Sequence, residues 1–320
     1  MSEVAEQLLL TTSRAGLRVA VLLPCYNEQE AIGKVVRDFR QALPEAIVYV
    51  YDNNSRDETR ARAAAAGAVV RSETQQGKGF VVRRMFADVE ADVYVLVDGD
   101  DTYHAPSAPL LVERLLAEQL DMVVGRRVTE IEQAYRPGHR LGNRLLTGVV
   151  ARVFGDRFKD ILSGYRVFSR RFVKSFPALT KEFEIETELT VHALELDMPI
   201  AEVDTPYKDR PAGSVSKLRT YRDGVRILTT ILVLFKEERP LAFFGLAGLA
   251  LAVLALGLGY PVLTEYLRTG LVPRFPTAIL ATGLMILAFL SFTSGLVLET
   301  VTRGRKELKR LAYLTIPGPR

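Results

Sequence analysis

Residues 93–101 read VYVLVDGDD, a short apolar stretch that ends in carboxylates. The apolar part has the length and the β-branched content of a strand buried inside a sheet. Asp98 and Asp100 stand directly after it, with Gly99 between them to let a ligand approach. Two carboxylates at the end of a buried strand predict a site for Mg²⁺ or Mn²⁺. The alternative is a turn in which the aspartates only cap the backbone.

Short apolar stretches alternate with helical patterns on both sides of this segment. Such alternation predicts an α/β fold, a Rossmann-like domain with a mostly parallel sheet and helices on both faces. The predicted strands are Val19–Pro24, Ile47–Tyr51, Ala68–Arg71, Val93–Val97 and Met122–Val124. The predicted helices are Glu28–Leu43, Ser55–Ala66, Lys78–Ala87 and Pro109–Glu118.

Two more polar clusters follow predicted strands, Asn27-Glu28 after the first and Asp52–Asn54 after the second. The carboxyl ends of parallel strands meet at one edge, so these clusters and Asp98 predict a single ligand-binding rim. Asp52 is placed to accept a hydrogen bond from a base or a ribose. The alternative is that Asp52 belongs to the cap of the following helix. Lys78 stands between glycines but lacks the spacing of a P-loop, and the first turn has no G-x-G-x-x-G, which disfavours nucleotide triphosphate hydrolysis and dinucleotide binding.

The C-terminal part carries two uncharged runs, Pro240–Thr264 and Phe275–Leu298, each longer than the ~20 residues that a membrane helix needs. Both are apolar on all sides, unlike the helices of a soluble core. Basic residues flank the outer ends of the hairpin, which predicts that the N-terminal domain and the C-terminal tail are cytoplasmic. The predicted organisation is a disordered N-terminus (1–17), a catalytic domain (18–217), a juxtamembrane segment (218–239), transmembrane helices (240–264 and 275–298) and a basic tail (299–320). The juxtamembrane segment is expected to lie on the membrane, or alternatively to pack on the soluble domain.

Composition excludes several classes of protein. The formal net charge of +4 is too small for a dedicated nucleic-acid binder, so no nucleic-acid partner is expected. A single cysteine excludes a disulfide framework and a thiolate zinc site. Glycines on the apolar runs (Gly245, Gly248, Gly257 and Gly259) allow helix association and hence a homo-oligomer.

Several ordered motifs together resemble glycosyltransferase family 2 with its GT-A fold. They are Pro24-Cys25-Tyr26-Asn27-Glu28, Asp52-Asn53-Asn54-Ser55, Gly77-Lys78-Gly79 and Asp98-Gly99-Asp100. Three further motifs resemble its polyprenyl-phosphate glycosyltransferase branch, which includes dolichol-phosphate mannose synthase and GtrB-like enzymes. They are Asp160 with Ser163-Gly164-Tyr165-Arg166, Phe183-Glu184-Ile185-Glu186, and residues 210–217 (RPAGSVSK).

The resemblance implies transfer of a sugar, with inversion, from a nucleotide-sugar to a polyprenyl phosphate at the cytoplasmic face of the inner membrane. It favours a UDP-hexose donor, with GDP-mannose as the alternative. A lipid phosphate is already anionic, so arginines that position and neutralise it can replace a catalytic base. The chain has no tryptophan, so it lacks the Q-x-x-R-W motif of processive synthases. The rival readings are a transferase acting on a lipid alcohol and a non-catalytic membrane module that binds nucleotide-sugars.

By motif position, the resemblance implies two sets of site residues. The expected catalytic and acceptor residues are Asp100, Arg127, Arg140, Ser163 and Arg166. The expected donor-binding residues are Pro24, Tyr26, Asn27, Glu28, Asp52, Asn54, Lys78, Asp98, Gly99, Glu186, Arg210, Ser216 and Lys217. Asp98 and Asp100 are the expected metal ligands, and Glu186 is alternatively the buried partner of an arginine. The histidines His104, His139 and His192 are expected to be structural.

The chain departs from the family pattern at two positions. Asn53 replaces the second aspartate of the second cluster, which leaves recognition of the base open. Thr102 stands where the family often has a glutamine that helps to hold the metal, so Asp101 or water is expected to substitute for it.

Overall fold

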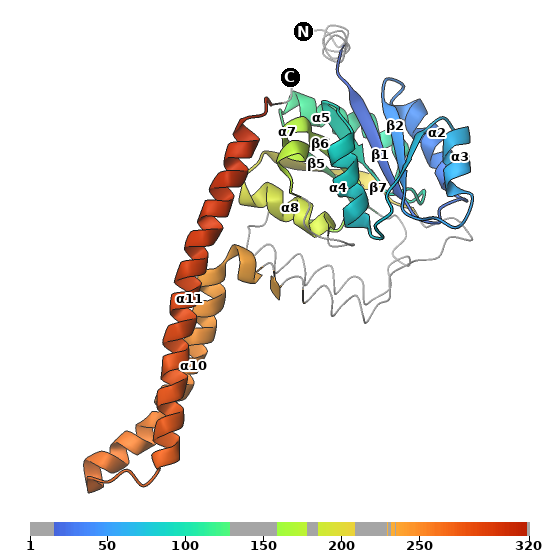
Figure 1. The fold of residues 1–320 in the computed structure, drawn as a ribbon. Coiled ribbons are helices and arrows are strands. Elements are labelled where there is room, and N and C mark those ends of the chain that lie inside the picture. The colour runs from blue at the N-terminus through green and yellow to red at the C-terminus, as the bar shows by residue number, and fades with distance from the viewer. Residues whose placement is uncertain are drawn as a thin grey trace. The chain divides into compact units, whose positions relative to one another are not determined.

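The computed structural model describes residues 16–128, 159–177, 185–208 and 235–318, together with residues 229, 232 and 233. The chain forms two compact units, residues 1–224 with 309–320, and residues 225–308. The first unit contains a seven-stranded sheet in the order β3-β2-β1-β4-β6-β5-β7 (Figure 1). Its strands are β1 (Val19–Cys25), β2 (Ile47–Asp52), β3 (Val69–Ser72), β4 (Val93–Leu96), β5 (Met122–Val128), β6 (Arg166–Ser169) and β7 (Ile200–Pro206). Its helices are α2 (Ile32–Ala42), α3 (Thr59–Ala65), α4 (Lys78–Asp88), the short 3₁₀ helix η1 (Ala105–Ser107), α5 (Ala108–Ala117), α7 (Arg170–Ser175) and α8 (Ile185–Glu195).

The sheet is parallel except for β6, which pairs antiparallel with both β4 and β5. The predicted mostly parallel α/β fold is therefore confirmed, and each predicted strand lies within a residue or two of an observed one, apart from β5, which runs on to Val128. In the register of β1 with β2, Cys25 stands opposite Asp52, so the chain leaves both strands at the same level. This register places the polar clusters on one rim.

Side chains that alternate along β4 divide the core between the two faces of the sheet. Val93 and Val95 belong to the core cluster that packs under α2 and α5. Tyr94 points to the other face, where its ring meets Phe86 of α4 edge-on. Both kinds of side chain are fully buried, which is why this strand reads as a continuous apolar run rather than as an alternating one.

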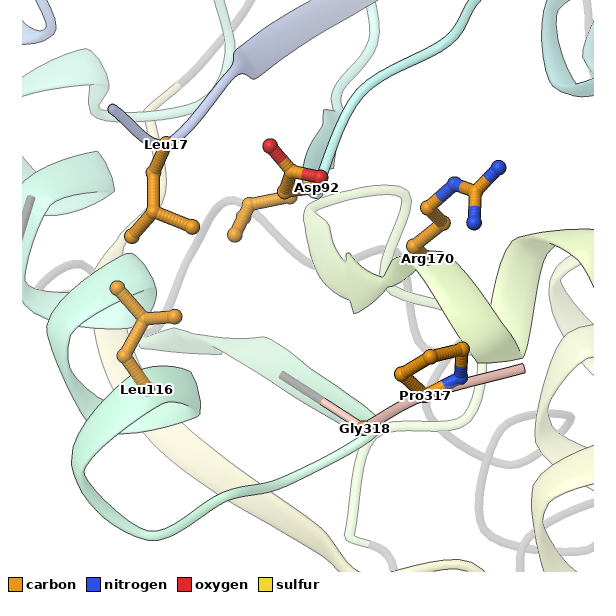
Figure 2. A pocket seen from close by; sticks show the side chains of 7 residues that line it. Leu17, Asp92, Leu116, Arg170, Pro317 and Gly318 are labelled. Carbon is orange, nitrogen blue, oxygen red and sulfur yellow. The ribbon is translucent and has the colours of Figure 1, made fainter. Parts of the chain in front are cut away.

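The rim lies at the carboxyl ends of the parallel strands. The opposite edge of the sheet, where β4 and β5 begin, contacts the end of the chain, residues 309–318, which belong to the first unit. Asp121, just before β5, has no exposed side-chain surface and accepts a hydrogen bond from the Tyr313 hydroxyl (2.7 Å). Lys309 Nζ contacts the buried Glu195 carboxylate at 2.6 Å. Figure 2 shows the nearby pocket, where Pro317 and Gly318 face Leu17, Asp92, Leu116 and Arg170. Within the predicted basic tail (299–320), residues 309–318 thus pack on the first unit, and their polar side chains bind buried carboxylates of that unit.

The second unit contains α10 (Pro240–Thr269) and most of α11 (Phe275–Leu314), which lie side by side (Figure 1). Both are long and apolar enough to span a membrane, at ~45 and ~60 Å for a hydrocarbon core of ~30 Å. They continue past the predicted spans 240–264 and 275–298. A Cβ at Gly248 would stand 2.9 Å from the carbonyl oxygen of Ala288, so glycine there permits close packing of the two helices. Of the predicted juxtamembrane segment, residues 218–228 lie outside the described part of the chain.

Candidate active site

The loops that follow β1 and β2 are hydrogen-bonded to each other at the rim. The Asn27 backbone N–H donates to Ser55 Oγ, and Asn27 Oδ1 accepts from the Arg56 backbone N–H, both at 2.8 Å. Asn27 and Asn54 have φ values of 52° and 64°, in the left-handed region that asparagine tolerates better than most residues. The Asn54 side chain donates to the Thr74 carbonyl at 2.9 Å. Both asparagines expected to bind the donor therefore also build the scaffold of the rim.

The hydrogen bonds of Asn53 account for an asparagine where the family pattern has an aspartate. Its amide nitrogen donates to the carbonyls of Glu73 (3.0 Å) and Gln75 (2.7 Å), and its oxygen accepts from the Gly77 backbone N–H (2.8 Å). An aspartate has no N–H to offer those two carbonyls. Asparagine at this position therefore holds the loop before α4 and places Lys78 at the start of that helix.

Asp52 is buried, with 3% of its surface exposed. Its Oδ2 accepts from the Ser55 backbone N–H at 3.2 Å. This contact lies in the turn before α3 and does not cap that helix, because α3 begins at Thr59 rather than at the predicted Ser55. Its Oδ1 has no hydrogen-bond partner among the described residues. Leaving a buried acceptor unpaired costs about 1–3 kcal/mol, so Oδ1 is suited to accept an N–H or O–H from a ligand.

Packing alone requires both glycines around Asp98. A Cβ at Gly99 would stand 2.6 Å from Cys25 Sγ, so packing against β1 requires glycine here in addition to its predicted role in ligand approach. A Cβ at Gly164 would stand 2.6 Å from Asp98 Oδ2. The Ser-Gly-Tyr-Arg turn therefore lies directly against the Asp98 carboxylate.

Lys78 joins two of the predicted donor-binding carboxylates. Its Nζ donates to Asp98 Oδ1 at 2.5 Å and to Glu186 Oε1 on α8. Burial lowers the pKa of Lys78, but the charges and hydrogen bonds of Asp98 and Glu186 outweigh burial and raise that pKa above its ordinary value. Lys78 is therefore a buried ammonium ion. The partner of Glu186 is this lysine rather than the arginine that the sequence allowed.

Asp100, 4% exposed, accepts a hydrogen bond from Thr102 Oγ1 at 2.6 Å. Asp101, which is expected to substitute for the glutamine of the family, binds Lys34 (3.0 Å) and Lys208 (2.8 Å) through its Oδ1. Within the described ranges, no group of three or more histidine, cysteine or acidic side chains is placed to hold a metal ion. An ion bound by Asp98 and Asp100 would take its remaining ligands from water and substrate phosphates, as Mg²⁺ commonly does.

Arg127, at the carboxyl end of β5, forms a two-pronged ion pair with Asp160. Arg127 Nε and Nη2 donate to the two carboxylate oxygens at 2.8 and 2.7 Å. The guanidinium also lies over the Tyr207 ring, 5.5 Å from its centre. Burial raises the pKa of Asp160, but hydrogen bonds and charge from Arg127 outweigh it and hold that pKa below its ordinary value. Asp160 therefore fixes the plane of a guanidinium at the rim, a partnership that the sequence analysis missed although it quoted both residues.

Ser163 and Arg166, expected to shape the sugar pocket, are enclosed by protein with no exposed surface. Ser163 Oγ donates to the Gly125 carbonyl at 2.6 Å. The Arg166 guanidinium donates to the Ser163 carbonyl (2.9 Å) and to Thr190 Oγ1 (2.8 Å). Burial lowers the pKa of Arg166 to about 10. The predicted substrate contact of this pair is corrected, because its polar groups are used to hold the turn behind Asp98.

Of the remaining predicted residues, some lie within the described part of the chain and others lie outside it. Pro24 and Tyr26 are part-buried at the end of β1, and the Glu28 backbone N–H donates to Thr59 Oγ1 at 2.8 Å. His192 packs edge-on against Phe172, as expected of a structural histidine. His104 contacts Ser107 Oγ through its Nδ1 at 3.0 Å. The residues outside the described part of the chain are Arg140, Arg210, Ser216, Lys217 and His139.

The fold and the rim define a glycosyltransferase of the GT-A type, and comparison with known proteins identifies its family. Residues 20–176 match the family described as Glycosyl transferase family 2. Glycosyltransferase AglJ of Haloferax volcanii is 33% identical over 305 residues, which cover 92% of this chain and 98% of that protein. The chain therefore belongs to glycosyltransferase family 2, as the sequence motifs predicted.

Two further similarities bear on the chemistry. A dolichyl-phosphate hexose transferase of the same organism is 29% identical over 221 residues, covering 69% of this chain and 95% of that protein. The solved structure of glucosyl-3-phosphoglycerate synthase from Mycobacterium tuberculosis, in complex with Mn²⁺, UDP-glucose and phosphoglyceric acid, has a TM-score of 0.57 at 25% identity. That match covers 70% of this chain and 81% of the other. Nucleotide-sugar donors and divalent metals are thus found in the same fold.

Proposed function

We propose that this glycosyltransferase transfers a sugar, with inversion, from a UDP-sugar to the phosphate of a polyprenol lipid. The observation that carries the proposal is the presence, in one chain, of a GT-A rim and two helices long enough to span a membrane. A lipid acceptor keeps its tail in the bilayer and its phosphate at the surface. An enzyme that uses such an acceptor gains from being anchored in the same membrane.

The donor is proposed to bind at the rim between β1, β2 and β4. Asp52 Oδ1 would accept a hydrogen bond from the base or the ribose, which would satisfy its buried acceptor. Asp98 and Asp100 would hold Mg²⁺ or Mn²⁺, which supplies positive charge to the diphosphate leaving group when it is bound. Lys78 binds both Asp98 and Glu186 and holds their carboxylates in place. The complex of a similar fold with UDP-glucose and Mn²⁺ supports UDP over GDP and a divalent ion over none.

The acceptor phosphate is proposed to bind to Arg127, together with Arg140 outside the described residues. Guanidinium groups bind phosphates well, and Asp160 fixes the orientation of this one by binding its Nε and Nη2. The nucleophile is a phosphate oxygen that already carries negative charge, so no group has to remove a proton. The reaction then depends on alignment of acceptor and donor and on charge neutralisation. The described histidines, His104 and His192, are not needed for this chemistry.

The proposed location is the cytoplasmic face of the inner membrane. Basic residues flank the outer ends of the hairpin, at Lys236 and Arg239 before α10 and at Arg303 and Arg305 along α11. The loop between the two helices carries fewer basic residues, so the positive-inside bias favours a cytoplasmic catalytic domain.

The test uses full-length protein in detergent with Mn²⁺ or Mg²⁺ and undecaprenyl phosphate. Radiolabelled UDP- and GDP-sugars are added singly, and label is counted in the organic phase. Label from one donor, lost with chelator, supports the proposal and identifies the sugar. Label on undecaprenol but not on its phosphate would indicate a transferase for lipid alcohols. Nucleotide binding without any lipid-linked label would indicate a binding module.

A further inference from the structure

Asp101 follows the Asp98-Gly99-Asp100 segment, and the reaction described above gives it no role. Its φ is 60°, in the left-handed region, and its side chain is only 11% exposed. Its Oδ1 accepts from two ammonium groups, Lys34 Nζ of α2 at 3.0 Å and Lys208 Nζ at 2.8 Å. One carboxylate thus joins the turn after β4 to two other elements.

The same turn is hydrogen-bonded to the residues that follow β7. The Lys208 backbone N–H donates to the Thr102 carbonyl at 3.0 Å. Tyr103 pairs with Tyr207 in an isolated β-bridge, and their rings meet edge-on with centres 5.2 Å apart. Thr102 also donates to Asp100. Residues 207–208 are therefore bound directly to the turn that carries Asp100.

This connection reaches both halves of the proposed site. On the acceptor side, the Tyr207 backbone N–H donates to the Val128 carbonyl at 3.0 Å, and its ring lies under the Arg127 guanidinium. On the donor side, the Tyr103 hydroxyl accepts from the Gly164 backbone N–H at 2.8 Å, and Gly164 lies against Asp98. The turn from Asp101 to Tyr103 is thus one of the segments that connect Asp98 and Asp100 with Arg127.

We propose that Asp101 is a positioning residue, which, by binding Lys208 and Lys34, holds the metal-binding turn in register with the Arg127 side of the site. The proposal rests on the proposed function, because it assumes that Asp100 binds a metal ion and that Arg127 binds the acceptor. Small displacements of reacting groups slow catalysis strongly. Loss of the Asp101 carboxylate is therefore expected to weaken metal binding and acceptor binding together, although Asp101 contacts neither.

The variants separate charge from backbone conformation. Asp101→Asn removes the charge but keeps a residue that tolerates the left-handed conformation. Lys208→Gln removes the partner after β7, and the double variant tests whether the two act together. Asp38→Asn is the matched control, because Asp38 binds the other side of the same Lys34 ammonium at 2.5 Å and is not part of the site.

The affinity of the full-length protein for Mn²⁺ in the presence of UDP is measured from the electron paramagnetic resonance signal of free Mn²⁺. We expect Asp101→Asn and Lys208→Gln each to weaken it about fivefold to tenfold, and the double variant to fall short of the product of the two. Asp38→Asn should equal wild type. With undecaprenyl phosphate as acceptor, KM should rise by a similar factor in Asp101→Asn.

Two results would overturn the proposal. One is an Mn²⁺ affinity in Asp101→Asn that stays within twofold of wild type. The other is a loss of more than a hundredfold in Asp101→Asn with no change in Lys208→Gln, since Asp101 would then be a metal ligand itself. If wild type transfers no sugar to the lipid phosphate, the proposed function fails, while the Mn²⁺ affinities still decide the role of Asp101.

Discussion

Each edge of the sheet in the first unit carries buried charged groups, and the two edges differ in how those charges are satisfied. At the edge before β5, both oxygens of Asp121 are filled by protein donors, Ser169 Oγ (2.6 Å), Arg171 (2.5 and 2.8 Å) and the Tyr313 hydroxyl (2.7 Å). At the rim, one oxygen of buried Asp52 has no partner among the described residues. A buried carboxylate whose two oxygens are both paired, such as Asp121, stabilises the fold. A buried carboxylate that keeps one oxygen unpaired, such as Asp52, is suited to bind a ligand.

The comparison predicts that rim carboxylates affect activity more than stability. Asp100→Asn and Asp98→Asn should each lower kcat/KM for the nucleotide-sugar by about a thousandfold, because each removes charge that orients the metal and the diphosphate. The melting temperature of Asp100→Asn should stay within about 2 °C of wild type. Asp98→Asn should also lower stability, because it leaves the buried Lys78 ammonium paired with Glu186 alone. Steady-state kinetics and thermal melts on the same samples measure both effects. Retention of a tenth of the wild-type activity would argue against a metal role for these residues.

The opposite edge should show the reverse pattern. Asp121→Ala leaves the Arg171 guanidinium without its carboxylate, and we expect a loss of about 3–5 kcal/mol in the free energy of unfolding. Denaturant titration of the full-length protein measures this loss. Well below the melting temperature, the variant should keep at least half of the wild-type kcat/KM. An activity loss larger than the stability loss explains would contradict the division between the two edges.

Arg127 should affect the acceptor and spare the donor. Arg127→Lys keeps the charge but loses the two-pronged contact with Asp160, so KM for the lipid phosphate should rise about tenfold to a hundredfold. KM for the nucleotide-sugar should change less than threefold. Asp160→Asn should reproduce part of the rise in KM for the lipid phosphate, because the Arg127 guanidinium is then no longer held in one orientation by a carboxylate. Equal changes in both KM values would place Arg127 on the donor instead.

His192, which lies on α8, should make the free energy of unfolding depend on pH. Burial, with a smaller contribution from the Lys309 charge, lowers the pKa of His192 to about 3, and Ser175 Oγ is 3.3 Å from its Nε2. Because the folded pKa lies below the unfolded value of ~6.5, its stabilising contribution is present above pH ~6.5 and is lost as the pH falls toward 3. At roughly pH 5 the loss is about 2 kcal/mol. Denaturant titrations of wild type and His192→Gln across this range should show a shallower pH dependence in the variant.

Tyr313→Phe is the mildest probe of the edge before β5. It removes one hydrogen bond to the Asp121 carboxylate, while Ser169 and Arg171 still bind that group. The expected loss is about 1–2 kcal/mol in the free energy of unfolding, with unchanged transfer activity. The same variant tests whether the end of the chain stabilises the domain. A melting temperature equal to wild type would show that residues 309–318 add little stability.

The sequence predicted those parts of the fold that follow from local patterns. Apolar stretches of strand length and uncharged runs of membrane length depend only on neighbouring residues. β1, β2, β4 and both long helices begin where predicted, and β3 begins one residue later. It did not predict β6, because Arg166 interrupts the apolar pattern and its burial depends on carbonyls and on Thr190.

The candidate site divides in the same way. Strand order placed Asp52 and Asp98 on one rim, since the carboxyl ends of parallel strands share an edge. Pairings between distant segments left no local signal, as with Lys78 and Glu186, Arg127 and Asp160, or Asp101 and Lys208. Only the structure, through these pairs, separates residues that hold the site together from residues placed to contact substrate.

The most direct test of the account is the mass of the product made from UDP-sugar and undecaprenyl phosphate by wild type, Asp100→Asn and Asp121→Asn. The account predicts a lipid heavier by one sugar residue, formed by wild type and by folded Asp121→Asn and lost in Asp100→Asn. A product of that mass in Asp100→Asn at the wild-type rate, or no such product from wild type with any donor sugar, would contradict it.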